Sequence, residues 1–211
     1  MFTEIDKILY PNRCEVMEVA PQRFVFPIFK NGSSSLRAQA KKDNWKILLN
    51  EQIKRCDKIE VFLREPAERF ASGAGSFIDD MVGSGIDKDA VFEFIQRYPF
   101  LNRHYLPQIH WLICLGRYLR DDAMLILNGL DSLDQLVDNN IKGDRSGSPT
   151  KMPQLANLPN MVFYMELDSF LYKIRNSETT LKHLLISMRN EHKQAYEHVF
   201  GHAKRLADVL P

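Results

Sequence analysis

Cysteine is scarce in this chain of 211 residues, and the few cysteines present form no recognisable pattern. Cys14, Cys56 and Cys114 are odd in number, and their spacing matches no metal-binding motif. Free thiols in a reducing compartment are the simplest interpretation. We therefore expect neither a disulfide-stapled scaffold nor a metal site.

An excess of charge and a long apolar run are also lacking. Lys and Arg together number 28 against 27 for Asp and Glu, so the net charge is +1. Such a chain has no overall basic field for nucleic acid or an anionic membrane, and any anion site must be local. No stretch of about 18 apolar residues occurs, and residues 1–6 lack the features of a signal peptide. We expect a cytoplasmic protein with no nucleic-acid or membrane partner.

The composition is otherwise that of an ordinary globular protein. Hydrophobic residues make up 45% of the chain and charged residues 26%. A length of 211 residues suffices for one domain with a substantial core. We therefore interpret residues 1–211 as a single domain.

Short apolar runs alternate with segments of helical spacing, which is typical of an α/β protein with a mainly parallel sheet. Strands are expected at 24–29, 59–63, 123–127 and 162–165, and helices at about 33–42, 66–80, 87–98, 112–120 and 131–137. Residues 1–22 are expected to be a polar lead-in, 139–153 a mobile loop and 177–210 C-terminal helices. The run 45–49 fits a short strand or a helix equally well.

The segment Lys30–Leu36 reads Lys-Asn-Gly-Ser-Ser-Ser-Leu and follows the apolar run 24–29. A strand, a tight glycine turn and a helix N-terminus bind phosphate, because free N–H groups of the first helical turn point at the anion. Gly32 permits close approach of the backbone, and Lys30 adds a point charge. The candidate residues for this group are Lys30, Asn31, Gly32, Ser33, Ser34 and Ser35.

A second element of the same kind follows the apolar run 59–63. Arg64 stands at the end of this expected strand, and Pro66 fits the first turn of a helix. Arg69 and Ser72 share one face of that helix, and the planar fork of arginine suits a terminal phosphate. We favour Arg64 and Ser72 as ligand contacts. Arg69 ranks below them, because its role is open between a ligand contact and a structural salt bridge within the helix.

These two elements resemble the phosphate motifs of sulfotransferases. Lys30–Leu36 looks like the loop for the 5′-phosphosulfate, and Arg64–Ser72 looks like the motif for the 3′-phosphate. His104–Gln108 is similar to the H-x-x-P-Q segment of carbohydrate-type (family 2) sulfotransferases, and Val162–Leu167 resembles their late strand. All four occur in the order of the family. Eukaryotic members usually carry a Golgi anchor, and this sequence shows no apolar segment of that kind. A soluble bacterial or viral relative, or a trimmed chain, is therefore expected.

The resemblance implies a three-layer, P-loop-like fold and the transfer of a sulfuryl group from 3′-phosphoadenylyl sulfate (PAPS) to a hydroxyl acceptor on a carbohydrate. The products would be the sulfated acceptor and adenosine 3′,5′-bisphosphate, and no metal is needed. Lys30 would stabilise charge that develops on the bridging oxygen. Residues 24–42 and 59–80 would form the two donor-binding units.

The general base is open between two residues. Histidine suits proton abstraction near neutral pH, which favours His104. Glutamate serves as the base in some relatives, and Glu51 lies between the two phosphate elements. Two other functions also stay open at this point: a divergent P-loop nucleotide kinase, and a nucleotide-binding or interaction protein of this fold without catalytic activity.

Overall fold

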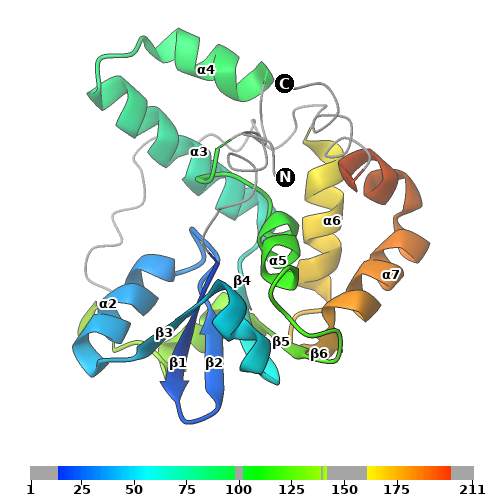
Figure 1. Cartoon of the computed structure of the whole chain (residues 1–211). Coiled ribbons are helices and arrows are strands. Elements are labelled where there is room, and N and C mark those ends of the chain that lie inside the picture. Colours follow the sequence, from blue (N-terminus) through cyan, green and yellow to red (C-terminus); the bar gives the residue numbers. More distant parts are fainter. Residues whose placement is uncertain (1–13, 98–101, 139, 142–160, 201–211) are drawn as a thin grey trace.

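The chain folds around one open sheet with helices on both of its faces (Figure 1). This computed structural model describes residues 14–97, 102–138, 140–141 and 161–200. The described residues form a six-stranded sheet in the order β3-β1-β2-β4-β5-β6. The strands are β1 (Glu15–Ala20), β2 (Arg23–Phe26), β3 (Lys46–Leu49), β4 (Lys58–Leu63), β5 (Met124–Gly129) and β6 (Ser177–Thr180).

Parallel pairing is confined to the middle of the sheet. β2 pairs with β4 and β4 with β5 in parallel, whereas β1–β2, β1–β3 and β5–β6 are antiparallel. The prediction of an α/β fold is confirmed, but the sheet is mixed and is parallel only in its centre. A tight turn can join only antiparallel strands, and such a turn at 21–22 connects β1 to β2.

Local sequence signals, such as a capping residue, account for the helices. The α-helices are α2 (Ser33–Asp43), α3 (Pro66–Gly83), α4 (Lys88–Arg97), α5 (Gln108–Gly116), α6 (Val162–Lys173) and α7 (Leu181–Glu191). Residues 193–200 are also helical, and two 3-10 helices are η1 (Asn50–Arg55) and η2 (Leu130–Gln135). Asp87 caps α4, because its carboxylate accepts bonds from the N–H groups of Asp89 and Ala90.

Alternate residues of the strands point to opposite faces of the sheet and build two apolar clusters. Val61 belongs to the larger cluster, which also contains residues of η1, α3, α5, α6 and α7. Its neighbour Phe62 belongs to the smaller cluster, together with Leu36 of α2 and Leu133 of η2. α2 and η2 therefore cover one face, and the remaining helices of these clusters cover the other.

Three predicted segments take a different structure. The expected strand at 162–165 is the start of helix α6, because its buried residues Tyr164, Leu167 and Leu171 recur at helical spacing. The lead-in contains strand β1, and the expected C-terminal helices are preceded by the edge strand β6. Local sequence does not reveal these two strands, because pairing of β1 with β2 and β3 and of β6 with β5 decides them. The predicted loop at 139–153 lies outside the described residues apart from 140–141, and so does the end of the chain from 201.

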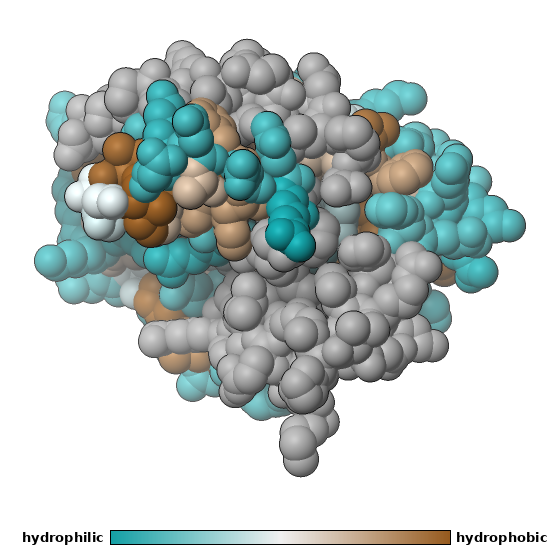
Figure 2. Space-filling view, turned by 90° about the horizontal axis from the view of Figure 1, so that it is seen from above, coloured by the Kyte–Doolittle hydropathy of each residue, from teal (hydrophilic) through white to brown (hydrophobic). Residues whose placement is uncertain are grey.

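α3 and α4 form a helical hairpin above the sheet (Figure 1). Phe77 of α3 and Phe94 of α4 pack against each other, with ring centroids 5.9 Å apart. Val82, Ile86 and Phe94 of this hairpin expose 41%, 46% and 39% of their surface. Seen from above, this side of the molecule shows apolar residues among hydrophilic ones (Figure 2). Among the described helices, none combines the length and the apolar character that crossing a membrane requires.

Candidate functional site

The two segments that resemble phosphate motifs, Lys30–Leu36 and Arg64–Ser72, begin side by side at the carboxyl ends of two central strands. β2 and β4 are neighbouring parallel strands, with Phe26 opposite Val61, so their carboxyl ends lie side by side. Lys30 follows β2 and precedes α2, and Arg64 follows β4 and precedes α3. Ligands of open α/β sheets bind outside the carboxyl ends of the strands. This edge is therefore the candidate site.

Lys30 occupies a constrained position in its loop. Its φ of 68° is in the left-handed region, which is uncommon for a residue other than glycine. Its Nζ donates to Ser76 Oγ on α3 at 2.8 Å and lies 5.4 Å from the ring centre of Phe29. Burial lowers the pKa of Lys30, and the charges of Arg69 and Arg64 lower it further while Asp80 opposes them. The ammonium group therefore lies in a half-buried, cation-rich place where an anion is favourable.

Asn31 is turned inward and does not face the candidate ligand site. Its side chain is 1% exposed, and its Nδ2 donates to Phe62 O at 2.8 Å and to Gln108 Oε1 at 2.5 Å. Its Oδ1 accepts from Arg69 Nε at 3.0 Å, and its main-chain N–H donates to Ile28 O. These internal bonds engage the polar side-chain atoms and the N–H of Asn31. Its role is to fix the loop.

Arg69 is a buried residue of α3 that bonds to this loop, not to its own helix. It is 1% exposed, and it donates to Phe29 O as well as to Asn31. Burial lowers its pKa to about 10, and the nearby Asp168 carboxylate opposes that shift. Arg69 thus makes structural contacts, but its partners lie in the loop on either side of Lys30 and not within its own helix, as a salt bridge there would require.

The remaining loop residues present an uncapped helix start. Gly32 is the N-cap of α2, with φ 77°, and no side chain caps the helix there. A Cβ at Gly32 would lie 2.3 Å from Leu133 Cδ2, so a larger residue would have a strained backbone and would have to displace the Leu133 side chain. Ser34 is exposed, whereas Ser33 and Ser35 are buried. The first-turn N–H groups of α2 have no intrahelical acceptor, as in any helix, and favour an anion.

The start of α3 differs from that of α2. The carboxylate of Glu65 caps α3 by accepting the N–H of Glu68 at 2.6 Å. Arg64 Nε lies 3.8 Å from Glu68 Oε2, and its side chain is 28% exposed. The cation of Arg64 is thus half-buried and only loosely paired. It is available to an anion at this edge, while the helix start itself is already capped.

One stripe of α3 faces Lys30 and the turn before α5. Ser72, Ser76 and Asp80 recur every fourth residue, which places them on one face of the helix. Ser76 receives the bond from Lys30 and donates to Ser72 O at 3.0 Å. Asp80 Oδ2 lies 3.5 Å from His104 Nε2. Of these three residues, only Ser72 is a sequence-predicted ligand contact, although the four-residue spacing of polar side chains also points to Ser76 and Asp80.

His104 is oriented by a neighbouring amide. Asn102 Oδ1 lies 2.8 Å from His104 Nδ1 and also accepts the main-chain N–H of His104 at 2.9 Å. An amide oxygen only accepts, so the hydrogen-bond network assigns the proton to Nδ1 and leaves the lone pair on Nε2. Burial and the charge of Lys30 lower the pKa of His104, and Asp80 opposes them. The neutral form of the imidazole is therefore favoured, with Nε2 beside Asp80.

Glu51 lies apart from this group. It is exposed on η1, which follows β3, and its carboxylate pairs with Lys54. In the sheet order β1 separates β3 from β2, which corresponds to about 10 Å between the two strands. The structure therefore brings Lys30, Ser76, Asp80 and His104 together and leaves Glu51 outside that group.

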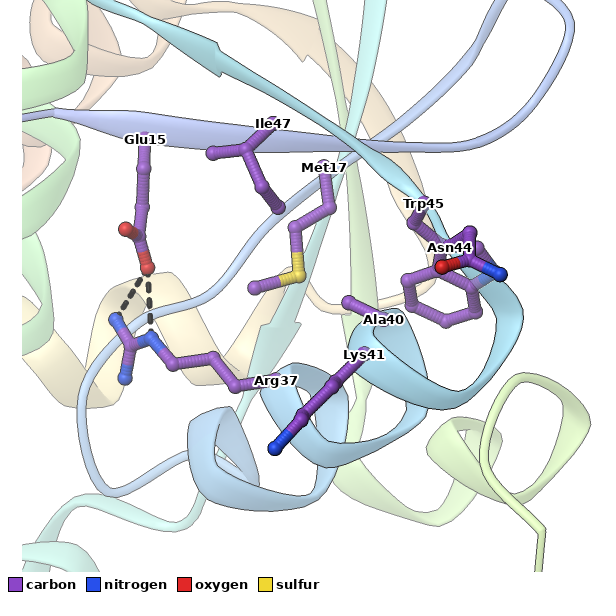
Figure 3. A pocket seen from close by; sticks show the side chains of 8 residues that line it. All are labelled: Glu15, Met17, Arg37, Ala40, Lys41, Asn44, Trp45 and Ile47. Carbon is purple, nitrogen blue, oxygen red and sulfur yellow. Dashed lines mark hydrogen bonds and ion pairs between the residues drawn. The ribbon is translucent and has the colours of Figure 1, made fainter.

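A separate hollow of about 480 Å³ lies between α2 and the strands β1 and β3 (Figure 3). Met17 and Trp45 line it, and an ion pair between Arg37 and Glu15 lies at one side. This hollow contains none of the sequence-predicted site residues. It is open at the edge of the sheet formed by β1 and β3.

Within the described part of the chain, no group of three or more His, Cys, Asp or Glu side chains is placed to hold a metal ion. No protein-family model matches this chain, and neither does any curated protein or solved structure. The geometry of the site and the motifs that form it are therefore the basis for a proposed function.

Proposed function

We propose that this chain is a sulfotransferase that moves the sulfuryl group of PAPS to a hydroxyl acceptor, on a P-loop-like fold. The observation that carries the proposal is the meeting of two cationic loops, at Lys30 and Arg64, at the ends of adjacent parallel strands. A ligand with two separate anionic groups fits this arrangement better than a ligand with one. Both loops also carry the sulfotransferase-like motifs.

The donor would lie across the carboxyl ends of β2 and β4. Its 5′-phosphosulfate belongs at the uncapped start of α2, near Lys30 and the exposed Ser34. Its 3′-phosphate belongs near Arg64, whose half-buried guanidinium offers a charge-assisted bond. Ser72 is half-buried on the stripe of α3 that Lys30 approaches, so it lies on the donor side of that helix.

The transfer step would use the groups gathered around Lys30. As the sulfuryl group leaves the donor, negative charge builds on the bridging phosphate oxygen, and the Lys30 ammonium is suited to stabilise it. His104 Nε2 would take the proton of the acceptor hydroxyl, and the nearby Asp80 would stabilise the imidazolium formed. Of the two base candidates, this geometry favours His104 over Glu51.

The acceptor is proposed to be a carbohydrate hydroxyl. The motif resemblance is one support for this, and two rings beside Lys30 are another. Phe29 stacks on Trp111 with ring centroids 6.3 Å apart, and both rings are half-buried. Such apolar walls with a few polar groups are usual in small-molecule sites. We also propose a cytoplasmic location, which the three buried cysteines favour because none of them forms a disulfide.

The proposal is tested first by ligand-induced stabilisation of the whole chain. Adenosine 3′,5′-bisphosphate without Mg²⁺, at 100-fold over its Kd, should raise the unfolding free energy by about 2.7 kcal/mol. Stabilisation by ATP with Mg²⁺ and not by the bisphosphate would instead indicate a nucleotide kinase.

The second test measures turnover with sulfur-labelled PAPS and a panel of mono- and oligosaccharide acceptors. Label should move to at least one hydroxyl acceptor. Binding of the bisphosphate with no transfer to any acceptor in the panel would indicate a nucleotide-binding protein without this activity.

A further inference from the structure

Gln108 links the two loops of the candidate site through one buried side-chain amide. It is the first residue of α5, and it is fully buried. Its Oε1 accepts from Arg64 N at 3.0 Å and from Asn31 Nδ2 at 2.5 Å. Its Nε2 donates to Arg64 O at 3.0 Å. A single side chain thus contacts both the segment after β2 and the segment after β4.

The contact with Arg64 resembles the pairing of a neighbouring strand. Gln108 satisfies both main-chain groups of Arg64, the residue directly after β4, as a ladder partner would. This fixes the backbone of Arg64 in a direction perpendicular to the strand. The guanidinium of Arg64 remains free to move on its side-chain bonds, but the point from which it projects is fixed.

The contact with Asn31 fixes the other loop. Asn31 is held in addition by Phe62 O and by Arg69, and Arg69 also holds Phe29 O. The residues on both sides of Lys30 are therefore anchored, which maintains the left-handed backbone of Lys30. Lys30 and Arg64 consequently project from two backbone positions whose separation is set by Gln108.

Gln108 is itself held from a third element. The carboxylate of Asp168 on α6 accepts the N–H groups of Gln108 at 2.8 Å and of Ile109 at 2.9 Å. Asp168 is 3% exposed, and it supplies the N-terminal cap that Pro107 lacks. The packed helices α5 and α6, and not a surface loop, therefore fix the position of the Gln108 amide.

We infer that Gln108 is a positioning residue that sets the separation of the two anion subsites and so makes the site selective for ligands with two phosphate-type groups. This inference rests on the proposed function. When both subsites are held at the correct separation, the second anionic group binds intramolecularly and its contribution adds to that of the first. When the separation fluctuates, the ligand must order the two loops on binding, and that cost cancels part of the gain. A ligand with one phosphate uses one subsite and loses less.

The test replaces Gln108 by Met, which has similar length and volume but no amide. Calorimetry gives the Kd of adenosine 3′,5′-bisphosphate, adenosine 5′-phosphate and adenosine 3′-phosphate for each folded variant. We expect the preference of the wild type for the bisphosphate over each monophosphate to fall by about tenfold in Gln108→Met. The absolute affinity for each monophosphate should change less than that.

Gln39→Met is the matched control. Gln39 is also a buried glutamine, 5% exposed, and its amide joins Asp43 on α2 to the main chain of Asp138, away from both loops. Its replacement should leave the preference for the bisphosphate unchanged. An unchanged preference in Gln108→Met, or an equal fall in both variants, overturns the inference.

Two further measurements keep the inference testable. If Gln108→Met does not fold, Gln108→Asn keeps an amide that is one methylene too short to reach both loops, and the same fall in preference is expected. Amide hydrogen exchange of the ligand-free chain should become faster at Arg64 and Asn31 in either variant and not in Gln39→Met. Unchanged exchange at these two positions overturns the positioning role without reference to any nucleotide. If the wild type binds no bisphosphate, the proposed function and the selectivity are overturned, and the exchange alone decides whether Gln108 holds the loops.

Discussion

Gly73 of α3 lies directly against the carbonyl oxygen of His104. A Cβ built at position 73 would lie 2.0 Å from that oxygen and 3.1 Å from the Cα of Tyr105. The turn that carries His104 can therefore approach α3 only because position 73 has no side chain. This close approach also places the imidazole beside Asp80 of the same helix.

Gly73→Ala is expected to destabilise the fold, although alanine is the better helix former. The new methyl group meets main-chain atoms that cannot rotate away, and such overpacking costs about 1–3 kcal/mol. Urea denaturation followed by circular dichroism measures the change. Gly83→Ala in the same helix is the control, because nothing lies within 4 Å of its Cβ position. It should be neutral or stabilising, and a neutral Gly73→Ala would contradict the observed packing.

Lys30→Ala is expected to lower turnover by about 10²–10³-fold with a much smaller loss of bisphosphate affinity, because the cation acts on charge that develops during transfer. Because the φ of Lys30 is 68°, lysine and alanine carry the same backbone strain there, and the substitution to alanine adds none. Lys30→Gly removes the same cation and also relieves that strain, and it should show the same loss of turnover. Lys41→Ala, an exposed cation on α2, serves as the control for net charge. Equal losses of turnover and affinity would show that Lys30 is only a binding cation.

His104→Ala is expected to lower turnover by about 10²–10⁴-fold and to leave bisphosphate binding intact. Glu51→Gln should have little effect, since Glu51 pairs with Lys54 outside the group around Lys30. Because burial and Lys30 lower the pKa of His104, the acidic limb of the wild-type rate profile should lie below pH 6.5. Loss of turnover in Glu51→Gln with an active His104→Ala would reassign the base to Glu51.

Asp80→Asn provides an independent check on the same residue. The Asp80 charge raises the pKa of His104 against the effects of burial and Lys30. Its removal should move the acidic limb of the rate profile to lower pH. An acidic limb that does not move would mean that His104 is not the group that titrates in the profile.

The stability of the fold is expected to fall as the pH decreases from 6.5 toward 4. Burial, with a smaller contribution from Arg69, lowers the pKa of His110 to about 4 from an ordinary 6.5. Between these values the unfolded chain binds a proton that the folded chain does not, so the unfolding free energy decreases by up to about 3 kcal/mol. His110→Phe, which can keep the ring stacked on Tyr164, should remove this part of the pH dependence. Urea titrations at pH 6.5 and 4.5 compare it with His183→Gln, a substitution at an exposed position of α7. An unchanged slope in His110→Phe would refute the assignment.

The parts of the fold that the sequence predicts are those whose signals are local. The junctions β2–α2 and β4–α3 each combine an apolar run with a helix start, and the structure has both. The segment Val162–Met165 is apolar over too few residues to distinguish a strand from a helix, and only the longer spacing of Tyr164, Leu167 and Leu171 reveals α6.

The arrangement of the site depends on contacts that no local pattern contains. Gln108 meets Asn31 and Asp168 across 77 and 60 residues of sequence. From the sequence alone, Asn31 is a candidate ligand contact. Asp168 directly follows Val162–Leu167, where an aspartate is typical of the cap of a following helix. Asp168 does act as a helix cap, but for α5, which only the packing of α6 against α5 determines.

The dependence of the loops on Gln108 and Asp168 has a consequence for the order of assembly during synthesis. Lys30 and Arg64 both lie in the first third of the chain, whereas the residues that hold their loops follow later, the last of them on α6. Contacts between residues far apart in sequence form late in folding, because closing long loops costs entropy first. An emerging chain that ends before α6 therefore carries both cationic segments without their final separation. Bisphosphate affinity should consequently report completion of the whole fold, and a truncated chain that ends before residue 161 should bind the nucleotide no better than it binds free phosphate.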